Sequence, residues 1–348
     1  MNKQVILTGI RANNRLHIGN FFGALLPTVD LSNTKDDDYI INLFVPDLHS
    51  FTTPIDHKYL YDQTFNNIKV YIASGLSLDK DDVNIYRQSY IPAHSELTWI
   101  LDCFTGFGEL SRMTQLKDKS AKEQNVTAAL FNYPVLMASD ILLYDALYVP
   151  VGDDQTQHLE FSRDLAIRFN NRFNKDVFVV PKPVKEQHSF FSRDQGLRIK
   201  DLSDPTKKMS KSDESEKGII FLDDAPEIAK KKILSATTDN LSSINYDPAK
   251  QPGISNLLVI LSLLNKEDIT KTIEAWKGKT AYKELKEEVA NKIKEFLTDF
   301  QEKYSKIDEL AIIKKLELSE AKMNKIANNK LMVVQKIVGL RKWTTKNS

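Results

Sequence analysis

Two polar segments of the chain, about 190 residues apart, carry residue types that can hold phosphate. The first is the turn-rich stretch 8–20, in which His17, Gly19 and Asn20 precede the apolar run 21–26. A glycine lets a base or a ribose approach the backbone, and the free N–H groups of a helix N-terminus attract phosphate. We therefore expect a strand, a phosphate-binding loop and a helix start here, although such a short glycine motif is by itself most often only a turn.

The second segment, 204–213, is a lysine- and serine-rich run. It holds Lys208, Met209, Ser210, Lys211 and Ser212. A run of this kind is usually a solvated loop. Two lysines and two hydroxyls on a movable segment are also what a polyphosphate leaving group requires, because positive charge must close over it as it is expelled. We predict that the two segments converge around the triphosphate of one nucleotide, with Met209 exposed between the lysines.

The remaining histidines and the single cysteine have ordinary structural interpretations. We expect His57, His94 and His188 to be surface or capping residues, and His158 to lie on an amphipathic helix. Cys103 is expected to be a small buried filler, since no base can be placed beside it. No HExxH or Cys/His ligand spacing occurs, so we predict no metal site.

Composition places the chain among ordinary soluble globular proteins. Its 48 Lys and Arg balance 47 Asp and Glu, so any contact with nucleic acid must be local, and we expect neither DNA nor membrane partners. One cysteine allows no internal disulfide. Nothing reaches 18 consecutive apolar residues and no cleavable leader is visible, so a cytoplasmic protein is expected.

Strand-like and helix-like stretches alternate in the first part of the chain, and this pattern must position the two polar segments. Strands are predicted at 4–8, 39–45, 83–86 and 148–151. Apolar residues spaced three or four apart predict a helix between Lys58 and Gly75, and another is expected over 156–170. The alternation favours an α/β fold with a parallel sheet, whose ligands lie at the carboxyl ends of the strands.

The last hundred residues differ in composition from the rest. All 12 prolines lie at or before Pro252, which favours long helices beyond it. Residues 249–348 hold 20 Lys and Arg against 13 Asp and Glu, a formal charge of +7. We predict an α/β domain over 1–216 and a basic helical domain over 217–348.

Further strings complete a pattern that resembles a known family. Besides the two polar segments, these strings span 108–115, 117–120, 132–144, 149–158 and 252–258. Together they resemble the class I aminoacyl-tRNA synthetases, and within them the bacterial tryptophanyl-tRNA synthetases, from Val5 to about Leu264. The resemblance implies a Rossmann-like catalytic domain with a helical insertion and dimer interface at about 93–170. It also implies a helical anticodon-binding domain, whose last helix packs back on the catalytic domain.

The resemblance assigns candidate roles around ATP. ATP contacts are implied for Arg11, Ala12, Asn13, Gly19, Asn20, Gly152, Asp153, Asp154, Ile199, Lys208, Met209, Ser210, Lys211 and Ser212. Lys117 and Lys119 would lie near pyrophosphate. Our candidates for charge stabilisation in catalysis are Lys208, Lys211, Lys119 and His17, with Mg²⁺ carried by ATP and no tightly bound cofactor.

The resemblance also assigns a tryptophan pocket. Its implied lining is Asp140, Gln155, His49, Tyr133, Met137, Val151, Gly9 and Ile10, with the last two as the floor. Asp140 lies in the apolar run 135–143, where a carboxylate is costly unless it is paired, so a helix cap or a buried salt bridge is the competing interpretation. The indole N–H needs an acceptor, but a phenol donates too, so Asp140 alone does not separate tryptophan from tyrosine.

The implied activity is formation of tryptophanyl-adenylate and transfer of tryptophan to tRNA(Trp) by a homodimer. We expect the basic helical domain to contact the tRNA, with base stacking on Trp276 or Tyr282. The chain departs from the family at 11–14, where Gln-Pro-Ser/Thr-Gly is usual, and at Pro46, where a small aliphatic residue is common. The alternatives are a tyrosyl-tRNA synthetase and a non-catalytic paralogue that binds tRNA or amino acid.

Overall fold

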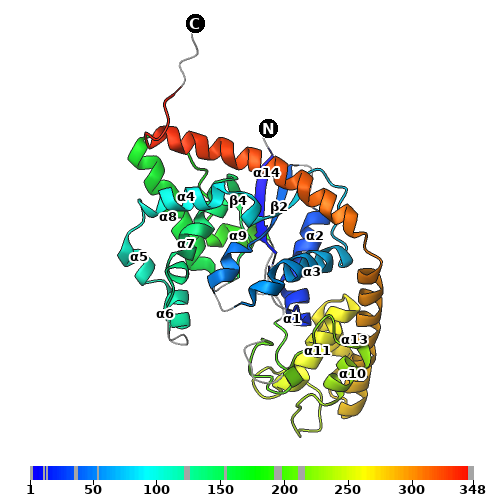
Figure 1. Ribbon diagram of the computed structural model, residues 1–348. Coiled ribbons are helices and arrows are strands. Elements are labelled where there is room, and N and C mark those ends of the chain that lie inside the picture. The colour runs from blue at the N-terminus through cyan, green and yellow to red at the C-terminus, as the bar shows by residue number, and fades with distance from the viewer. Residues whose placement is uncertain are drawn as a thin grey trace.

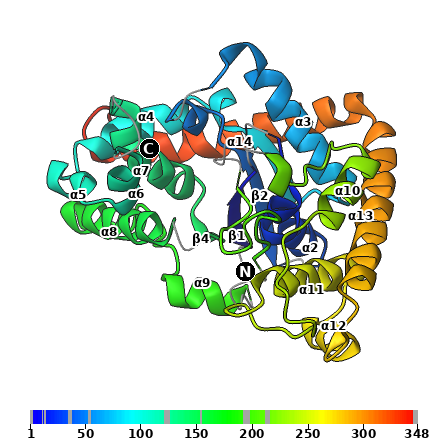
Figure 2. The ribbon, with the colours of Figure 1, turned by 90° about the horizontal axis from the view of Figure 1, so that it is seen from below.

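Four parallel strands form one sheet between two groups of helices (Figures 1 and 2). The computed structural model describes residues 3–10, 12, 15–34, 38–52, 55–120, 126–152, 155–191, 198–210 and 216–343, apart from the side chains of 118–120. The strands are β1 (Gln4–Gly9), β2 (Tyr39–Val45), β3 (Val83–Arg87) and β4 (Ala146–Tyr148), in the spatial order β3-β2-β1-β4. The predicted parallel sheet is therefore confirmed.

Helices cover the strands closely enough to bury whole stretches of them. In β2 the last five residues are buried, and in β3 all five are, as expected when helices cover both faces of a parallel sheet. The fourth strand begins two residues before its predicted start and ends at Tyr148, because only that part pairs with β1. Pro150, which we had placed inside this strand, lies in the segment that follows it.

Helices make up the rest of the regular structure. They are α1 (Ile18–Asn20), α2 (Leu26–Thr34), α3 (Leu60–Ala73), α4 (Ala93–Asp102), α5 (Phe107–Ser111), α6 (Thr114–Ser120), α7 (Ala128–Leu142), α8 (Thr156–Phe173), α9 (Val184–Phe190), α10 (Pro226–Leu234), α11 (Pro252–Asn265), α12 (Ile269–Trp276), α13 (Tyr282–Ser305) and α14 (Glu309–Ile337). A π-helical turn, Phe21–Leu25, joins α1 to α2. The helices from α10 to α13 gather at one end of the molecule, as Figures 1 and 2 show. The proline-free part of the chain is helical, as predicted.

Helix α14 returns across the molecule and covers the edge strand β3 (Figure 1). The backbone N–H of Ile85 donates to Ser319 Oγ at 3.2 Å. The Arg87 guanidinium donates to both carboxylate oxygens of Glu320, at 2.7 and 2.9 Å. An edge strand presents unpaired N–H groups, so side chains from α14 take the place of a further strand. The described part of the chain has no helix long and apolar enough to cross a membrane.

Three exposure predictions were wrong. Cys103 is exposed at the end of α4 and is not a buried filler. Trp276 is buried among apolar residues, so its ring is not free to stack on a base, whereas Tyr282 is half-buried and its stacking role stays a prediction. Met209 is only 1% exposed. In each case the surrounding tertiary contacts, which residue type and spacing do not show, decide the exposure.

Candidate active site

A pocket of about 360 Å³ opens at the carboxyl ends of β1 and β2. It is lined by Leu7, Gly9, Phe44, Pro46, His49, Thr52, Tyr133, Met137, Asp140, Ile141, Val149, Pro150, Val151, Gly152 and Gln155. This is the place where ligands bind in open parallel sheets, and the volume suits a small molecule. The lining is mostly apolar and contains a single carboxylate.

Seven of the eight residues proposed for the tryptophan pocket line this cavity. The exception is Ile10, which is 0% exposed in the core, with its N–H donating to the Phe44 carbonyl at 2.7 Å. Leu7 and Gly9 of β1 line the pocket, and Pro46, a departure from the family pattern, lies in its wall. A Cβ added to Gly9 would lie at an ordinary contact distance of 3.4 Å from the Phe44 ring.

Asp140 is held by donors from three other elements. His49 Nε2 lies 2.9 Å from Oδ2, whereas His94 Nδ1 lies 2.6 Å and Gln88 Nε2 lies 2.7 Å from Oδ1. The second nitrogen of His94 lies 2.8 Å from the Tyr144 hydroxyl. Asp140 is thus a buried, hydrogen-bonded carboxylate on the wall of an apolar pocket.

These contacts keep the carboxylate charged. Burial alone raises the pKa of Asp140, but hydrogen bonds from His49 and His94 outweigh it and leave the pKa below its usual value. Burial raises the pKa of the Tyr144 phenol well above its usual value, so that hydroxyl keeps its proton. The pocket therefore offers a fixed hydrogen-bond acceptor to a ligand.

The sequence reasoning missed two residues of this network. His94 is 0% exposed and is neither a surface nor a capping residue as we had expected, and Gln88 was not singled out. The available signal was their position just after a predicted strand, at the edge where the pocket lies. His158 does lie on α8 as predicted, where it is buried and its Nε2 is 2.9 Å from the hydroxyl of Tyr133 in the pocket wall.

The two polar segments meet beside α1. A Cβ added to Gly19 would lie 3.6 Å from Met209 Cβ, so the two segments are in contact here, and glycine avoids a tight 3.0 Å contact with the His17 ring. The Met209 N–H donates to the Ile199 carbonyl at 3.2 Å, while Lys208 is exposed. We call His17, Gly19, Asn20, Ile199 and residues 208–210 the nucleotide side of the site.

Part of the expected phosphate cradle is already occupied. The Ile18 N–H donates to the Ile220 carbonyl at 3.0 Å, and the Asn20 N–H donates to His17 Nδ1 at 3.3 Å. His17 thus caps the helix through Nδ1 and is 3% exposed. Phosphate contacts must come from other groups of this segment, and the role of His17 toward phosphate stays a prediction.

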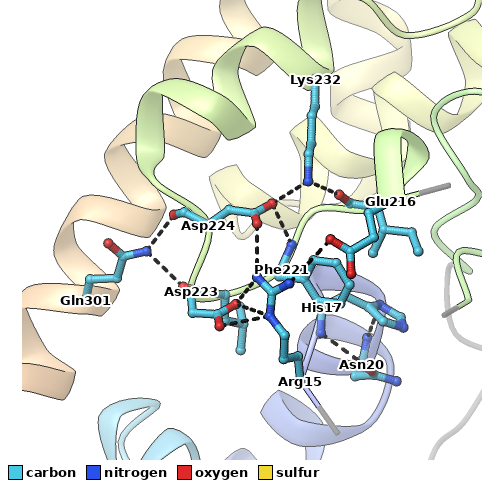
Figure 3. Close-up of polar contacts among 11 residues, drawn as sticks. Arg15, His17, Asn20, Glu216, Phe221, Asp223, Asp224, Lys232 and Gln301 are labelled. Carbon is cyan, nitrogen blue, oxygen red and sulfur yellow. Dashed lines mark hydrogen bonds and ion pairs between the residues drawn. The ribbon is translucent and has the colours of Figure 1, made fainter.

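An ionic clasp fastens this segment to the chain beyond Lys208 (Figure 3). Arg15 donates to both oxygens of Asp223, at 2.7 and 2.9 Å, and its guanidinium lies 3.9 Å from the centre of the Phe221 ring. The Leu222 N–H donates to the Leu16 carbonyl at 2.9 Å, next to an isolated antiparallel β-bridge between His17 and Phe221. We call Arg15, Phe221 and Asp223 the clasp.

Helix α11 fixes the arm that leads to Met209. The Asn256 side chain accepts from the Lys200 N–H at 2.8 Å and donates to the Lys200 carbonyl at 3.0 Å. The backbone of Lys200 in turn forms an isolated antiparallel β-bridge with the backbone of Lys208. A Cβ on Gly253 would come within 2.1 Å of the Thr237 carbonyl oxygen. The string 252–258 therefore positions the lysine-rich segment.

The remaining predicted site residues divide into two groups. Ala12 is buried and its carbonyl accepts from Thr64 at 3.1 Å, and Gly152 lies at the pocket rim next to Gln155. The positions that lie outside the described residues are Arg11, Asn13, Asp153, Asp154, Lys211, Ser212 and the side chain of Lys119. Within the part that the structure describes, no group of three or more candidate ligands could hold a metal ion.

Comparison with known proteins agrees with this geometry. A family model described as tRNA synthetases class I (W and Y) matches residues 2–298. A tryptophan–tRNA ligase of Caldanaerobacter subterraneus subsp. tengcongensis is 42% identical over 335 residues, covering 96% of this chain and 98% of that protein. A crystal structure of tryptophanyl-tRNA synthetase from Mycoplasma pneumoniae has a TM-score of 0.81 at 33% identity, covering 97% of this chain and 98% of that one. Another, from Campylobacter jejuni complexed with ADP and tryptophan, has a TM-score of 0.78 at 28% identity, covering 97% and 100%. The chain belongs to the class I tRNA synthetases of the tryptophan and tyrosine group.

Proposed function

We propose that the pocket binds L-tryptophan with its indole N–H on Asp140, and that ATP binds on the nucleotide side. The protein is a tryptophan–tRNA ligase, as its curated relatives are. The observation that carries the residue roles is the buried Asp140 carboxylate, which lies on the wall of an apolar pocket at the carboxyl end of β1, the strand that leads into the first polar segment. Tyr133, Met137 and the remaining lining residues enclose the ring.

In the first step the carboxylate of tryptophan attacks the α-phosphate of ATP and pyrophosphate leaves. A free α-carboxyl group has a pKa of about 3.5, so the nucleophile is already ionised and needs no general base. The protein must align the reactants and supply positive charge to the departing pyrophosphate. We assign the charge to Lys208, Lys211 and Lys119, with Mg²⁺ arriving as part of the ATP substrate. His17 holds the start of α1 in place.

In the second step the tryptophanyl group passes to the 3′-terminal ribose of tRNA(Trp). The basic helical part supplies phosphate contacts, and a second copy of the chain completes the assembly through the region 93–170. The exposed rings of Trp99 and Phe107 in that region suit such a contact. A cytoplasmic enzyme fits these partners.

Amino-acid-dependent exchange of pyrophosphate into ATP tests this proposal. We expect purified protein to catalyse exchange with tryptophan and to show little exchange with tyrosine. Exchange that tyrosine supports and tryptophan does not would overturn the substrate assignment. Tryptophan binding with no adenylate formation would instead favour the second candidate, a non-catalytic paralogue. That candidate is motivated by the departure from the family pattern at 11–14.

A further inference from the structure

A closed group of polar side chains lies behind the wall of the pocket. Asp140 comes from α7, His94 from α4, Tyr144 from the turn after α7, and Gln88 from the short 3-10 helix that follows β3. Gln88 and His94 are 0% exposed, Asp140 is 1% exposed and Tyr144 is 3% exposed. Polar groups this deeply buried are costly unless they are paired, so their arrangement is constrained by hydrogen bonding.

The two oxygens of Asp140 are not equivalent. Oδ1 receives Gln88 Nε2 at 2.7 Å and His94 Nδ1 at 2.6 Å, and a carboxylate oxygen has about two acceptor sites. Oδ2 receives only His49 Nε2, at 2.9 Å, among the described residues. Oδ1 is therefore saturated, and the remaining acceptor capacity lies on Oδ2.

The donors on Oδ1 are fixed in their roles. An ionised carboxylate only accepts, so Gln88 must present its amide N–H₂, and His94 must carry a proton on Nδ1. In the Nδ1-protonated tautomer of the ring Nε2 is an acceptor, and the Tyr144 hydroxyl, 2.8 Å away, is then the donor to it. A chain of donors thus runs from Tyr144 through His94 to Asp140.

We propose that His94 is a positioning residue for tryptophan recognition: with Gln88 it fills Oδ1 of Asp140, so that Oδ2 is the atom that receives the indole N–H. Tyr144 positions His94 in turn by fixing its tautomer. This inference rests on the proposed binding of tryptophan by Asp140 and deepens it.

The experiment compares two ligands that differ only in the donor. Tryptophan and 3-benzothienylalanine have nearly the same shape, but sulfur replaces the indole N–H in the second. Calorimetry gives the ratio of their dissociation constants, which isolates the hydrogen bond to Asp140. Wild-type protein should prefer tryptophan by about tenfold or more, as expected for a buried hydrogen bond to a charged group.

Substitutions of His94 test whether it creates this preference. His94→Ala should reduce the ratio to about threefold or less while ATP binding is retained. His94→Asn places an amide N–H close to the position of Nδ1, so it should restore most of the preference.

Two neighbouring tyrosines supply a matched pair of milder variants. Tyr144→Phe removes the donor to His94 and should lower the ratio by about threefold. The rings of Tyr86 and Tyr144 lie 5.4 Å apart and their hydroxyls interact with each other, so Tyr86 reaches His94 only through Tyr144. Tyr86→Phe should therefore change the ratio less than Tyr144→Phe does.

The outcomes separate the two levels of the proposal. If His94→Ala and Tyr144→Phe weaken both ligands equally and keep the wild-type ratio, these residues serve only the fold and the inference is wrong. If wild-type protein binds the two ligands equally, Asp140 does not receive the indole N–H, and the proposed tryptophan pose fails together with the inference.

Discussion

The amino-acid pocket and the nucleotide side both follow strand β1, but they are built differently. In the pocket, Asp140 is 1% exposed and is held by three side-chain donors. On the nucleotide side Lys208 is exposed, and in the clasp that adjoins it the Arg15 and Asp223 side chains are 39% and 63% exposed. One region is a buried hydrogen-bond network, and the other relies on charges at the surface.

The difference fits the requirements of the two substrates that we propose for these regions. Discriminating one amino-acid side chain from another needs a buried polar group that loses a partner when the wrong ligand binds. A departing pyrophosphate needs positive charge in the transition state, on a segment that can follow it. Damage to the pocket should therefore appear as lost affinity and stability, whereas damage on the nucleotide side should appear as lost rate.

The largest expected effect is on the nucleotide side. Lys208→Ala should slow tryptophan-dependent pyrophosphate exchange by about 10²-fold or more, because it removes charge that stabilises the transition state. Tryptophan affinity, measured by calorimetry, should be nearly unchanged.

The adjacent lysine provides a matched control. Lys207 is also exposed, but its ammonium pairs with Asp204 at 3.1 Å, so Lys207→Ala should change exchange only slightly. Equal losses in both variants would mean that exchange depends on the general charge of the segment, and the specific role of Lys208 would be abandoned.

The next effect belongs to the pocket. Asp140→Ala should weaken tryptophan binding by about 1–3 kcal/mol, the cost of a lost buried hydrogen bond, with little change in ATP affinity. Calorimetric titrations with each ligand measure both. A comparable loss for ATP would show that the substitution disturbs the whole site, and the contrast between the two regions would disappear.

Sequence reasoning reached the two regions unequally. The meeting of Gly19 with Met209 followed from residue types on two segments, because few roles other than phosphate binding explain both at once. His94 was wrongly expected at the surface because its partners lie 46 and 50 positions away, so its place after a predicted strand was the one local signal of its role. The choice of Asp140 came from family resemblance, since the apolar run around it was equally consistent with a structural ion pair.

A smaller effect is expected at the clasp. Arg15→Ala should lower the free energy of unfolding by about 1 kcal/mol, the combined range of an exposed ion pair and a cation–π contact. Arg15→Lys keeps the charge but loses the two-pronged contact, and should lie between wild type and Arg15→Ala.

Salt sharpens this test. At about 1 M salt the Debye length is roughly 3 Å, so the loss of unfolding free energy caused by Arg15→Ala should shrink. The loss of unfolding free energy caused by Asp140→Ala should persist, because Asp140 is buried. Urea unfolding at low and high salt measures both penalties. Salt-independent loss at Arg15 would place the clasp in the same class as the buried network.

The smallest effect is the response of stability to pH, and it contrasts two carboxylates. The pKa of Asp140 is lowered by hydrogen bonds from His49 and His94 against the opposing effect of burial, and that of the exposed Asp204 is lowered by Thr206 and Lys207. A carboxyl group whose pKa is lower in the folded state stabilises the fold above its unfolded pKa of about 3.9 and loses this contribution as pH falls through the folded value.

The difference in thermal midpoint between wild type and Asp140→Asn should therefore be constant from pH 7 to about 5 and should shrink below about pH 4. The corresponding difference for Asp204→Asn should change less, because solvent screens an exposed carboxylate. If the difference in thermal midpoint changes equally with pH for the two variants, burial of Asp140 adds nothing to the pH dependence of folding stability.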